Sequence, residues 1–215
     1  MALATYNDLL AAVANRMDRS DLTALTPEFV SCAEAEFNRV LRLPFQYTPD
    51  ALLSVSSRYT DLPADFLQMD RVYWIDDGRR RPLQYAGVDY RTHDDGTDTS
   101  NRPAEYAIKG AQIEVIPAPT VSLSLRISYW AKIAALVSEV NKLYASHPDL
   151  YLYRSCYEAA VYMMDQERMT FYLGLYDRLM TEVKEIERNS QKRTPQSLRT
   201  DVPWGAGGGF NIYAG

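Results

Sequence analysis

The sequence predicts a mainly α fold: a bundle of about four helices, with a small antiparallel β module inserted into it and an extended C-terminal tail. Three observations predict it. Apolar residues recur at helical spacing near both ends, short apolar runs between Pro, Gly and Asp fill the middle, and the last residues have neither period. The expected parts are a helical hairpin (1–50), a β module (51–130), two further helices (131–189) and a tail (190–215).

The hairpin begins with a helix whose apolar face runs from Tyr6 to Met17, and we expect this helix to end near Asp18. Thr26-Pro27-Glu28 then predicts a second helix start, because it offers a capping hydroxyl, a proline and an acidic first turn. This helix should stop before Pro44. Its expected inward residues are Phe29, Val30, Ala33, Phe37, Val40 and Leu41.

The β module is predicted by runs of apolar and β-branched residues at 52–55, 71–75, 112–116 and 123–130. Asp76-Asp77-Gly78 is typical of a hairpin turn, and the run Arg79-Arg80-Arg81 follows it. Residues 94–98, which include Asp94 and Asp95, are expected to form a solvated loop tip.

The later helices start at Ser146-His147-Pro148-Asp149, and the first of them should run to about Gln166. It is apolar on more than one side, so it must be buried either inside its own bundle or in an interface shared between subunits. A further amphipathic helix should end at residues 188–190.

Composition limits the classes of function. The chain has 215 residues, 47% of them hydrophobic, with 23 basic and 28 acidic residues for a net charge of −5, which disfavours binding of DNA phosphates by the overall field. No apolar run reaches the roughly 18 residues that cross a membrane, and two cysteines make no disulfide framework. We expect a soluble, unsecreted protein with no membrane partner.

No pattern predicts catalysis, a cofactor or a metal. The two histidines, His93 and His147, are interpreted as a loop residue and a helix-entry residue, and Cys32 and Cys156 as small buried side chains in helices. The neighbouring carboxylates Glu34 and Glu36, or Asp94 and Asp95, are interpreted as surface groups. The expectation is that the chain is not an enzyme, and the alternative is a soluble enzyme with a carboxylate-based site.

A second alternative is a small DNA-binding regulator that uses the N-terminal hairpin. Residues 1–50 hold four basic and seven acidic residues, so a recognition helix there would be repelled by the duplex.

Several segments, in order, resemble the head-to-tail adaptor proteins of tailed bacteriophages. They include residues 6–9, 15–22, 27–30 and 33–42, the element Leu62-Pro63-Ala64-Asp65-Phe66, and residues 103–108, 116–119, 127–130, 148–153 and 158–160. The resemblance implies a dodecameric ring beneath the portal protein of the capsid, without catalysis. It implies that the ring is a platform for the nozzle or tail, and that genome DNA passes through its bore without sequence-specific binding. The protein would be made in the host bacterial cytoplasm and reside in the virion.

Two partner-binding sites are predicted. The tail carries a net charge of +3 over Arg188, Lys192, Arg193, Arg199 and Asp201, opposite in sign to the whole chain, and could pair with an acidic portal surface. Its apolar anchors would be Trp204, Phe210, Ile212 and Tyr213. An inert flexible end is the alternative.

The second predicted site joins the two tips of the β module. Arg79, Arg80 and Arg81 at one tip, and Asp94 and Asp95 at the other, could contact a neighbouring subunit or the next tail protein. A solvated hairpin end is the alternative for the arginines.

Overall fold

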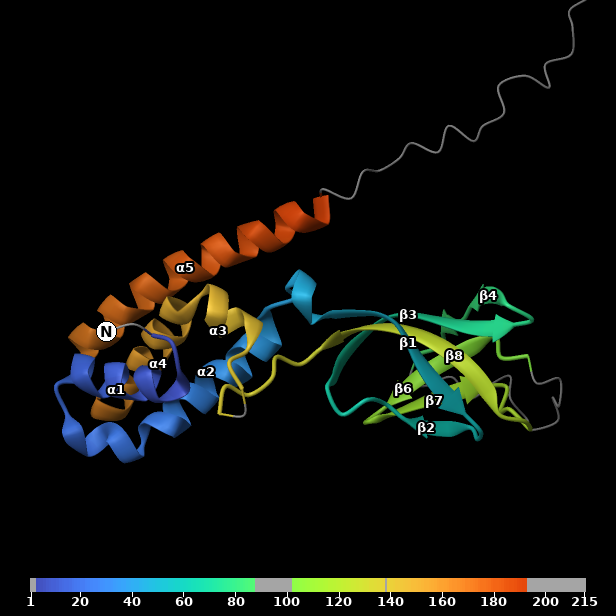
Figure 1. Cartoon of the computed structure of the whole chain (residues 1–215), viewed down its shortest axis with the longest axis horizontal. Helices are drawn as coiled ribbons and strands as arrows, with labels where there is room; N and C mark the ends of the chain where they lie inside the picture. The colour runs from blue at the N-terminus through green and yellow to red at the C-terminus, as the bar shows by residue number, and fades with distance from the viewer. Residues whose placement is uncertain (1–2, 88–101, 138, 193–215) are drawn as a thin grey trace, which may run out of the picture.

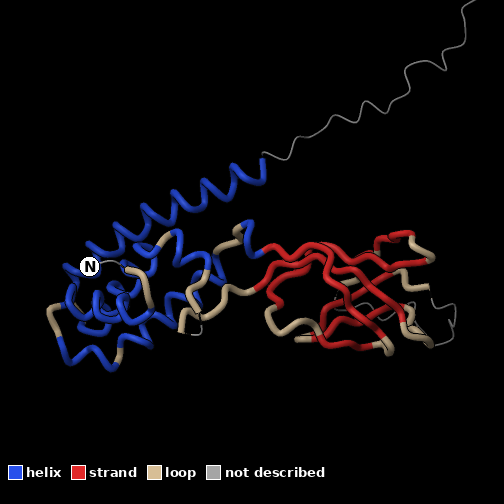
Figure 2. Tube along the Cα trace, in the orientation of Figure 1, coloured by secondary structure: helices blue, strands red, loops and turns tan. Residues whose placement is uncertain are grey.

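The computed structural model places a helical bundle and a β sandwich side by side along the long axis of the molecule (Figure 1). It describes residues 3–87, 102–137 and 139–192. Helices gather at one end and strands at the other, and two connecting segments join them (Figure 2). The expectation of a mainly α fold is therefore wrong: the described residues contain eight strands in two sheets besides five α-helices, which is a mixed α/β architecture.

The bundle is built from α1 (Tyr6–Met17), a 3-10 turn η1 (Ser20–Ala24), α2 (Thr26–Val40), α3 (Lys142–Ser146), α4 (Pro148–Met163) and α5 (Gln166–Lys192). Thr5 and Asp8 form a capping box at the start of α1, and Asp18 ends α1 in the left-handed conformation. The hydroxyl of Thr26 is no cap, contrary to expectation: it is buried and donates to the Leu22 carbonyl oxygen at 3.0 Å.

Helix α4 occupies the centre of the bundle and packs against α1, α2 and α5. Its two apolar sides are explained by this position, because Leu150, Tyr151, Cys156 and Ala159 are all buried. The ring of Phe37 in α2 meets that of Tyr151 edge-on at 4.8 Å. Of the two alternatives, burial inside its own bundle holds for most of α4.

The sandwich consists of two four-stranded sheets, in the orders β1-β8-β3-β4 and β2-β7-β6-β5. All strand pairs are antiparallel except that of β5 with β6. The strands are β1 (Tyr47–Val55), β2 (Tyr59–Asp61), β3 (Phe66–Asp76), β4 (Arg79–Pro82), β5 (Gln84–Tyr85), β6 (Glu105–Lys109), β7 (Gln112–Ile116) and β8 (Leu123–Ala131).

The core of the sandwich lies between the sheets, where Ile113 and Val115 of β7 face Leu125 and Ile127 of β8. The turn between β3 and β4 has positive φ at both Asp77 and Gly78, as a two-residue hairpin requires, so the predicted turn is confirmed. Strand β1 begins at Tyr47, four residues before the expected start of the β module.

Side chains of α2 hold the connectors between the two parts. Asn38 Oδ1 accepts the backbone N–H of Ile133 at 2.8 Å, and Glu34 Oε1 accepts that of Leu136 at 2.6 Å. Arg42, in the other connector, donates from Nε to Gln68 of β3 at 3.0 Å. These hydrogen bonds fix the positions of the two connecting segments between the bundle and the sandwich.

Candidate partner-binding surfaces

A partly buried cluster of charged and aromatic groups holds α5 against the bundle. The Arg154 guanidinium of α4 lies 2.6 Å from Glu36 and 2.5 Å from Glu158, and within 5.4 Å of the rings of Tyr157 and Tyr176. Tyr176 of α5 donates its hydroxyl to Glu36 at 2.7 Å. Burial, and then the bond to Glu36, raises the pKa of Tyr176, so this hydroxyl stays a donor at any physiological pH.

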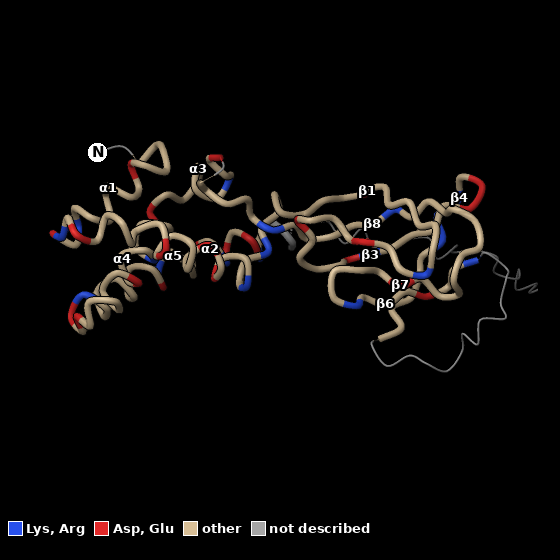
Figure 3. The backbone as a smooth tube through the Cα atoms, turned by 90° about the horizontal axis from the view of Figure 1, so that it is seen from below, with Lys and Arg blue, Asp and Glu red and all other residues tan. Residues whose placement is uncertain are grey.

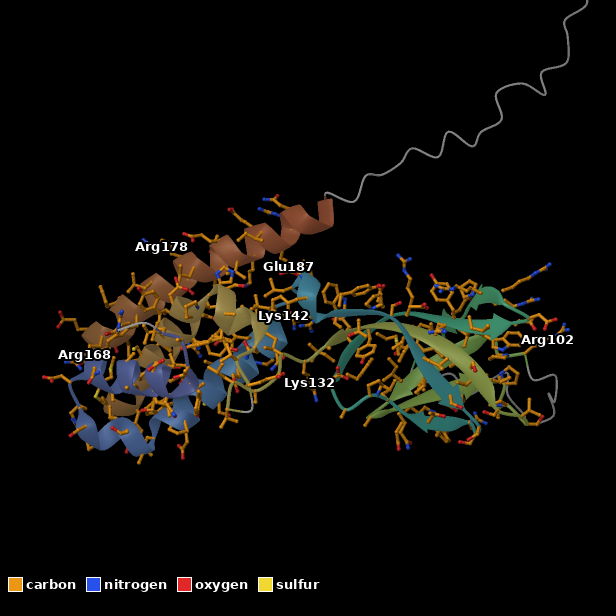
Figure 4. All side chains as sticks on the ribbon, viewed as in Figure 1. Arg102, Lys132, Lys142, Arg168, Arg178 and Glu187 are labelled. Atoms are coloured by element: carbon orange, nitrogen blue, oxygen red, sulfur yellow. The ribbon has the colours of Figure 1, made fainter. Side chains whose placement is uncertain are left out.

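The far end of α5 passes the junction between bundle and sandwich, where Figure 4 labels Glu187. Burial raises the pKa of the Glu187 carboxyl, although the backbone N–H of Arg42 donates to it. The helix continues through Arg188 to Lys192, so the first residues of the expected tail are helical. Arg188 is exposed, 3.9 Å from Glu185. The remaining predicted portal contacts, Arg193, Arg199, Trp204, Phe210, Ile212 and Tyr213, lie outside the described residues.

Exposed apolar side chains gather where α4 turns into α5. Tyr162, Met164 and Phe171 are exposed by 59%, 89% and 61%, and we call them the corner patch. Tyr162 rests against the buried ring of Phe29, and Phe171 against that of Tyr172. Met164 has φ 56°, a left-handed conformation in which glycine is usual. A large apolar residue at such a position has no folding advantage there, which is typical of a binding surface.

The helical spacing of the sequence could not reveal the corner patch. Met164 lies within the span of the helix predicted to run to Gln166, but α4 ends at Met163 and the chain turns. Val40 of α2, also expected inward, is 41% exposed.

Two of the three predicted hairpin arginines have partners within the chain. Arg80 lies 2.9 Å from Asp50, and Arg81 lies 2.8 Å from Asp76 with its guanidinium over the Trp74 ring. The acidic turn after β3 and the basic strand β4 are adjacent in Figure 3. Asp94 and Asp95 lie outside the described residues. Among the residues that are described, the side chain of Arg79 has no ion-pair partner, unlike those of Arg80 and Arg81.

Glu34 and Glu36, the carboxylates considered for catalysis, make contacts that stabilise the fold. Glu36 is held by Arg154 and Tyr176, and Glu34 holds the backbone of the connector. Burial raises the pKa of Glu34 more than the N–H of Leu136 lowers it. His147 is the residue before α4, as predicted, whereas His93 lies outside the described residues.

The cysteines differ from each other. Cys156 is buried, and burial raises the pKa of its thiol to about 12, so the thiolate is suppressed. Cys32 is exposed on α2, and its interpretation as a buried side chain is wrong. Within the part of the chain that is described, no group of His, Cys, Asp and Glu side chains could hold a metal ion.

The sandwich has its own buried carboxylate. Glu114 of β7 is 2% exposed and lies 2.6 Å from Arg58 and 2.5 Å from Lys109. Burial alone would raise its pKa, but the hydrogen bonds and charges of Lys109 and Arg58 outweigh burial and lower it. Glu114 therefore stays charged as a clamp between β7 and its neighbours.

The sequence profile of the SU10 adaptor protein family matches residues 4–201, which cover both the bundle and the sandwich. The chain belongs to the SU10 adaptor protein family. Members of this family are structural adaptors of bacteriophage virions, which agrees in kind with the resemblance seen in the sequence. No curated protein matched the chain. In the described ranges, no helix of this SU10 adaptor protein combines the length and apolarity needed to span a membrane.

Proposed function

We propose that this chain is a head-to-tail adaptor that docks on the portal protein and assembles with copies of itself into a ring. The ring gives the nozzle or tail a platform and encloses a bore for the genome. The observation that carries the proposal is the family match across both structural parts, from residue 4 to residue 201. A net charge of −5 suits a bore through which phosphates pass without being held.

The corner patch supports contacts between copies. Its three side chains project from the end of the bundle, and each is more than half exposed. Burying such side chains against a neighbour gains roughly 1.5–3 kcal/mol per residue before the entropic costs of association. We assign the corner patch to the contact between neighbouring subunits in the ring.

Attachment to the portal is assigned to the C-terminal residues. Arg188, Lys192, Arg193 and Arg199 supply positive charge in a chain that is negative overall, and Trp204 adds an apolar anchor. Deleting residues 195–215 should weaken portal binding by at least tenfold while leaving thermal unfolding of the bundle unchanged. Equal portal affinity of the truncated and full chains would remove the C-terminal residues from this role.

The β4 arginines form the second proposed contact, with a neighbouring subunit or the next tail protein. Replacing Arg79, Arg80 and Arg81 by serine should slow assembly, and more strongly at low salt. Arg79→Ser alone should account for most of the effect, because Arg80 and Arg81 are paired to Asp50 and Asp76. An assembly rate that is unchanged at every salt concentration would mean that these arginines are solvated and make no contact in the assembly.

Light scattering after size-exclusion chromatography tests the proposal. The isolated protein should have the mass of a monomer at several concentrations, and the purified portal should recruit it in a fixed ratio. A protein that never co-elutes with a portal would contradict the adaptor role.

A further inference from the structure

Within the described residues, one flank of the sandwich is only partly covered by a neighbouring strand in each of the two sheets. Strand β3 pairs with β8 from Phe66 onward, but β4 covers its other side only from Tyr73 to Asp76. In the second sheet, β5 pairs with β6 only at Glu105 and Tyr106. Among the described residues, the first half of β3 and the second half of β6 thus have no neighbouring strand on this flank.

A groove of about 520 Å³ lies between these two open edges. Phe66 and Met69 of β3, Tyr106 and Ile108 of β6, and Tyr85 of β5 line it. Phe66, Met69 and Ile108 are only partly buried although they pack on the core of the sandwich, and Tyr85 is 56% exposed. The core is open to solvent here, and none of the residues that line the groove carries a formal charge.

Open strand edges beside an apolar groove are the requirements for strand addition. The backbone N–H and C=O groups of the edge pair with an incoming extended segment, and the groove takes every second side chain. We propose that this flank binds an added β-strand, and that the strand is residues 210–213 of this chain.

The sequence of that segment fits the groove. Phe210-Asn211-Ile212-Tyr213 places Phe210 and Ile212 on one face of an extended strand, and residues 202–215 carry no charged side chain. Four residues span about 13 Å, and the open stretch from Phe66 to Asp70 spans about 16 Å. The uncharged segment thus matches the uncharged groove in both length and alternation.

The segment is connected to α5, whose far end lies beside the junction with the sandwich (Figure 1). Seventeen residues separate Lys192 from Phe210, and they reach up to about 55 Å when extended. Gly207, Gly208 and Gly209 directly before the segment remove side chains that would hinder its approach to the edge. We therefore assign the added strand to the same chain.

The inference goes beyond the proposed function, because strand addition needs neither portal nor ring. It is tested on the full chain by amide hydrogen exchange of residues 66–70. In the double variant Phe210→Ser/Ile212→Ser, the amides of this stretch that point to the open edge, instead of to β8 or to the Pro63 carbonyl, should exchange at least tenfold faster than in the unchanged protein. Tyr85→Ser, which alters the groove instead of the segment, should have the same effect.

Trp204→Ser and Leu52→Ser are matched controls, since Trp204 precedes the segment and Leu52 is a 61% exposed residue on the distant edge strand β1. In both control variants, the amide hydrogens of residues 66–70 should exchange at the same rate as in the unchanged protein. Equal exchange in the double variant and the unchanged protein overturns the proposal. Protection that Tyr85→Ser removes but the double variant keeps would mean that another segment occupies the groove, and also overturns it.

Discussion

The sandwich holds a buried carboxylate and the bundle a half-buried one, and the pKa values of the two are shifted in opposite directions. Glu34 in the bundle is held by one backbone N–H, and burial raises its pKa. Glu114 in the sandwich is held by Arg58 and Lys109, which lower its pKa against the effect of burial. Glu34 positions a connector between the two parts, whereas Glu114 links β7 to the neighbouring chain segments that carry Arg58 and Lys109.

The two parts also differ in where their apolar side chains are exposed. The bundle surrounds α4, and the three side chains of the corner patch are among its most exposed apolar groups. The sandwich is open along one flank, where Tyr85 and Met69 line a groove. The proposed contacts differ accordingly: the corner patch would meet a folded neighbour, and the groove an extended segment.

The two parts can be followed separately in unfolding. Trp74 and Trp130 lie in the sandwich, and helical circular dichroism reports the bundle. Phe37→Ala should lower bundle stability by about 3–5 kcal/mol, because it empties the space beside Tyr151. With Trp204 replaced by Phe, the helical signal should shift to lower urea and the tryptophan signal much less. Equal shifts of both signals would show that the parts unfold as one unit.

The attachment of α5 gives the next effect. Arg154→Met should cost about 3 kcal/mol of bundle stability, since it leaves Glu36 and Glu158 without their cation. Adding Glu36→Gln should recover part of the loss. Urea unfolding followed by circular dichroism measures both variants. A double variant less stable than Arg154→Met would contradict the charge balance described for this cluster.

The two carboxylates predict opposite responses to acid. The stability that Glu114 contributes is present above its ordinary pKa of 4.5 and is lost as pH falls through its lowered pKa. The contribution of Glu34 is full below 4.5 and is lost as pH rises through its raised pKa. As pH falls toward 4.5 the bundle should gain stability, and below 4.5 the sandwich should lose stability.

Single substitutions isolate these two responses. Glu34→Gln should flatten the gain in the helical signal above pH 4.5, and Glu114→Gln should flatten the loss in the tryptophan signal below it. A pH dependence that is unchanged in either variant would assign the response to other groups.

The smallest effect on stability is expected at the corner patch. Met164→Gly should stabilise the bundle by about 0.5–1 kcal/mol, because glycine adopts the left-handed conformation without strain. It should nevertheless weaken ring assembly. Asp18→Gly relieves the same conformation at the end of α1 without removing an apolar side chain, so it should stabilise the fold and leave assembly unchanged. Assembly reduced equally by both variants would remove Met164 from the interface.

The sequence alone predicted much of the bundle, because its helices carry long apolar periods and clear end signals, as at Asp18 and Pro148. The sandwich was underestimated. Strands β2 and β5 have three and two residues, too few to show a period, and β4 is mostly arginine. Four of the eight described strands carry apolar runs, so sequence patterns alone favour a mainly α fold.

The candidate surfaces were harder to predict. The arginine run was visible, but its pairing with Asp50 and Asp76 depends on contacts across the sheet. The open flank arises because β4 and β5 stop short of β3 and β6. Such a mismatch in strand length is a property of the pairing, which single-strand patterns do not contain.

Electron microscopy of portal particles with and without this protein tests the central claim most directly. The account predicts an additional ring of density at one end of the portal when the protein is present, with the sandwich and bundle resolved in each repeat. Portal particles that look the same with and without the protein would contradict it.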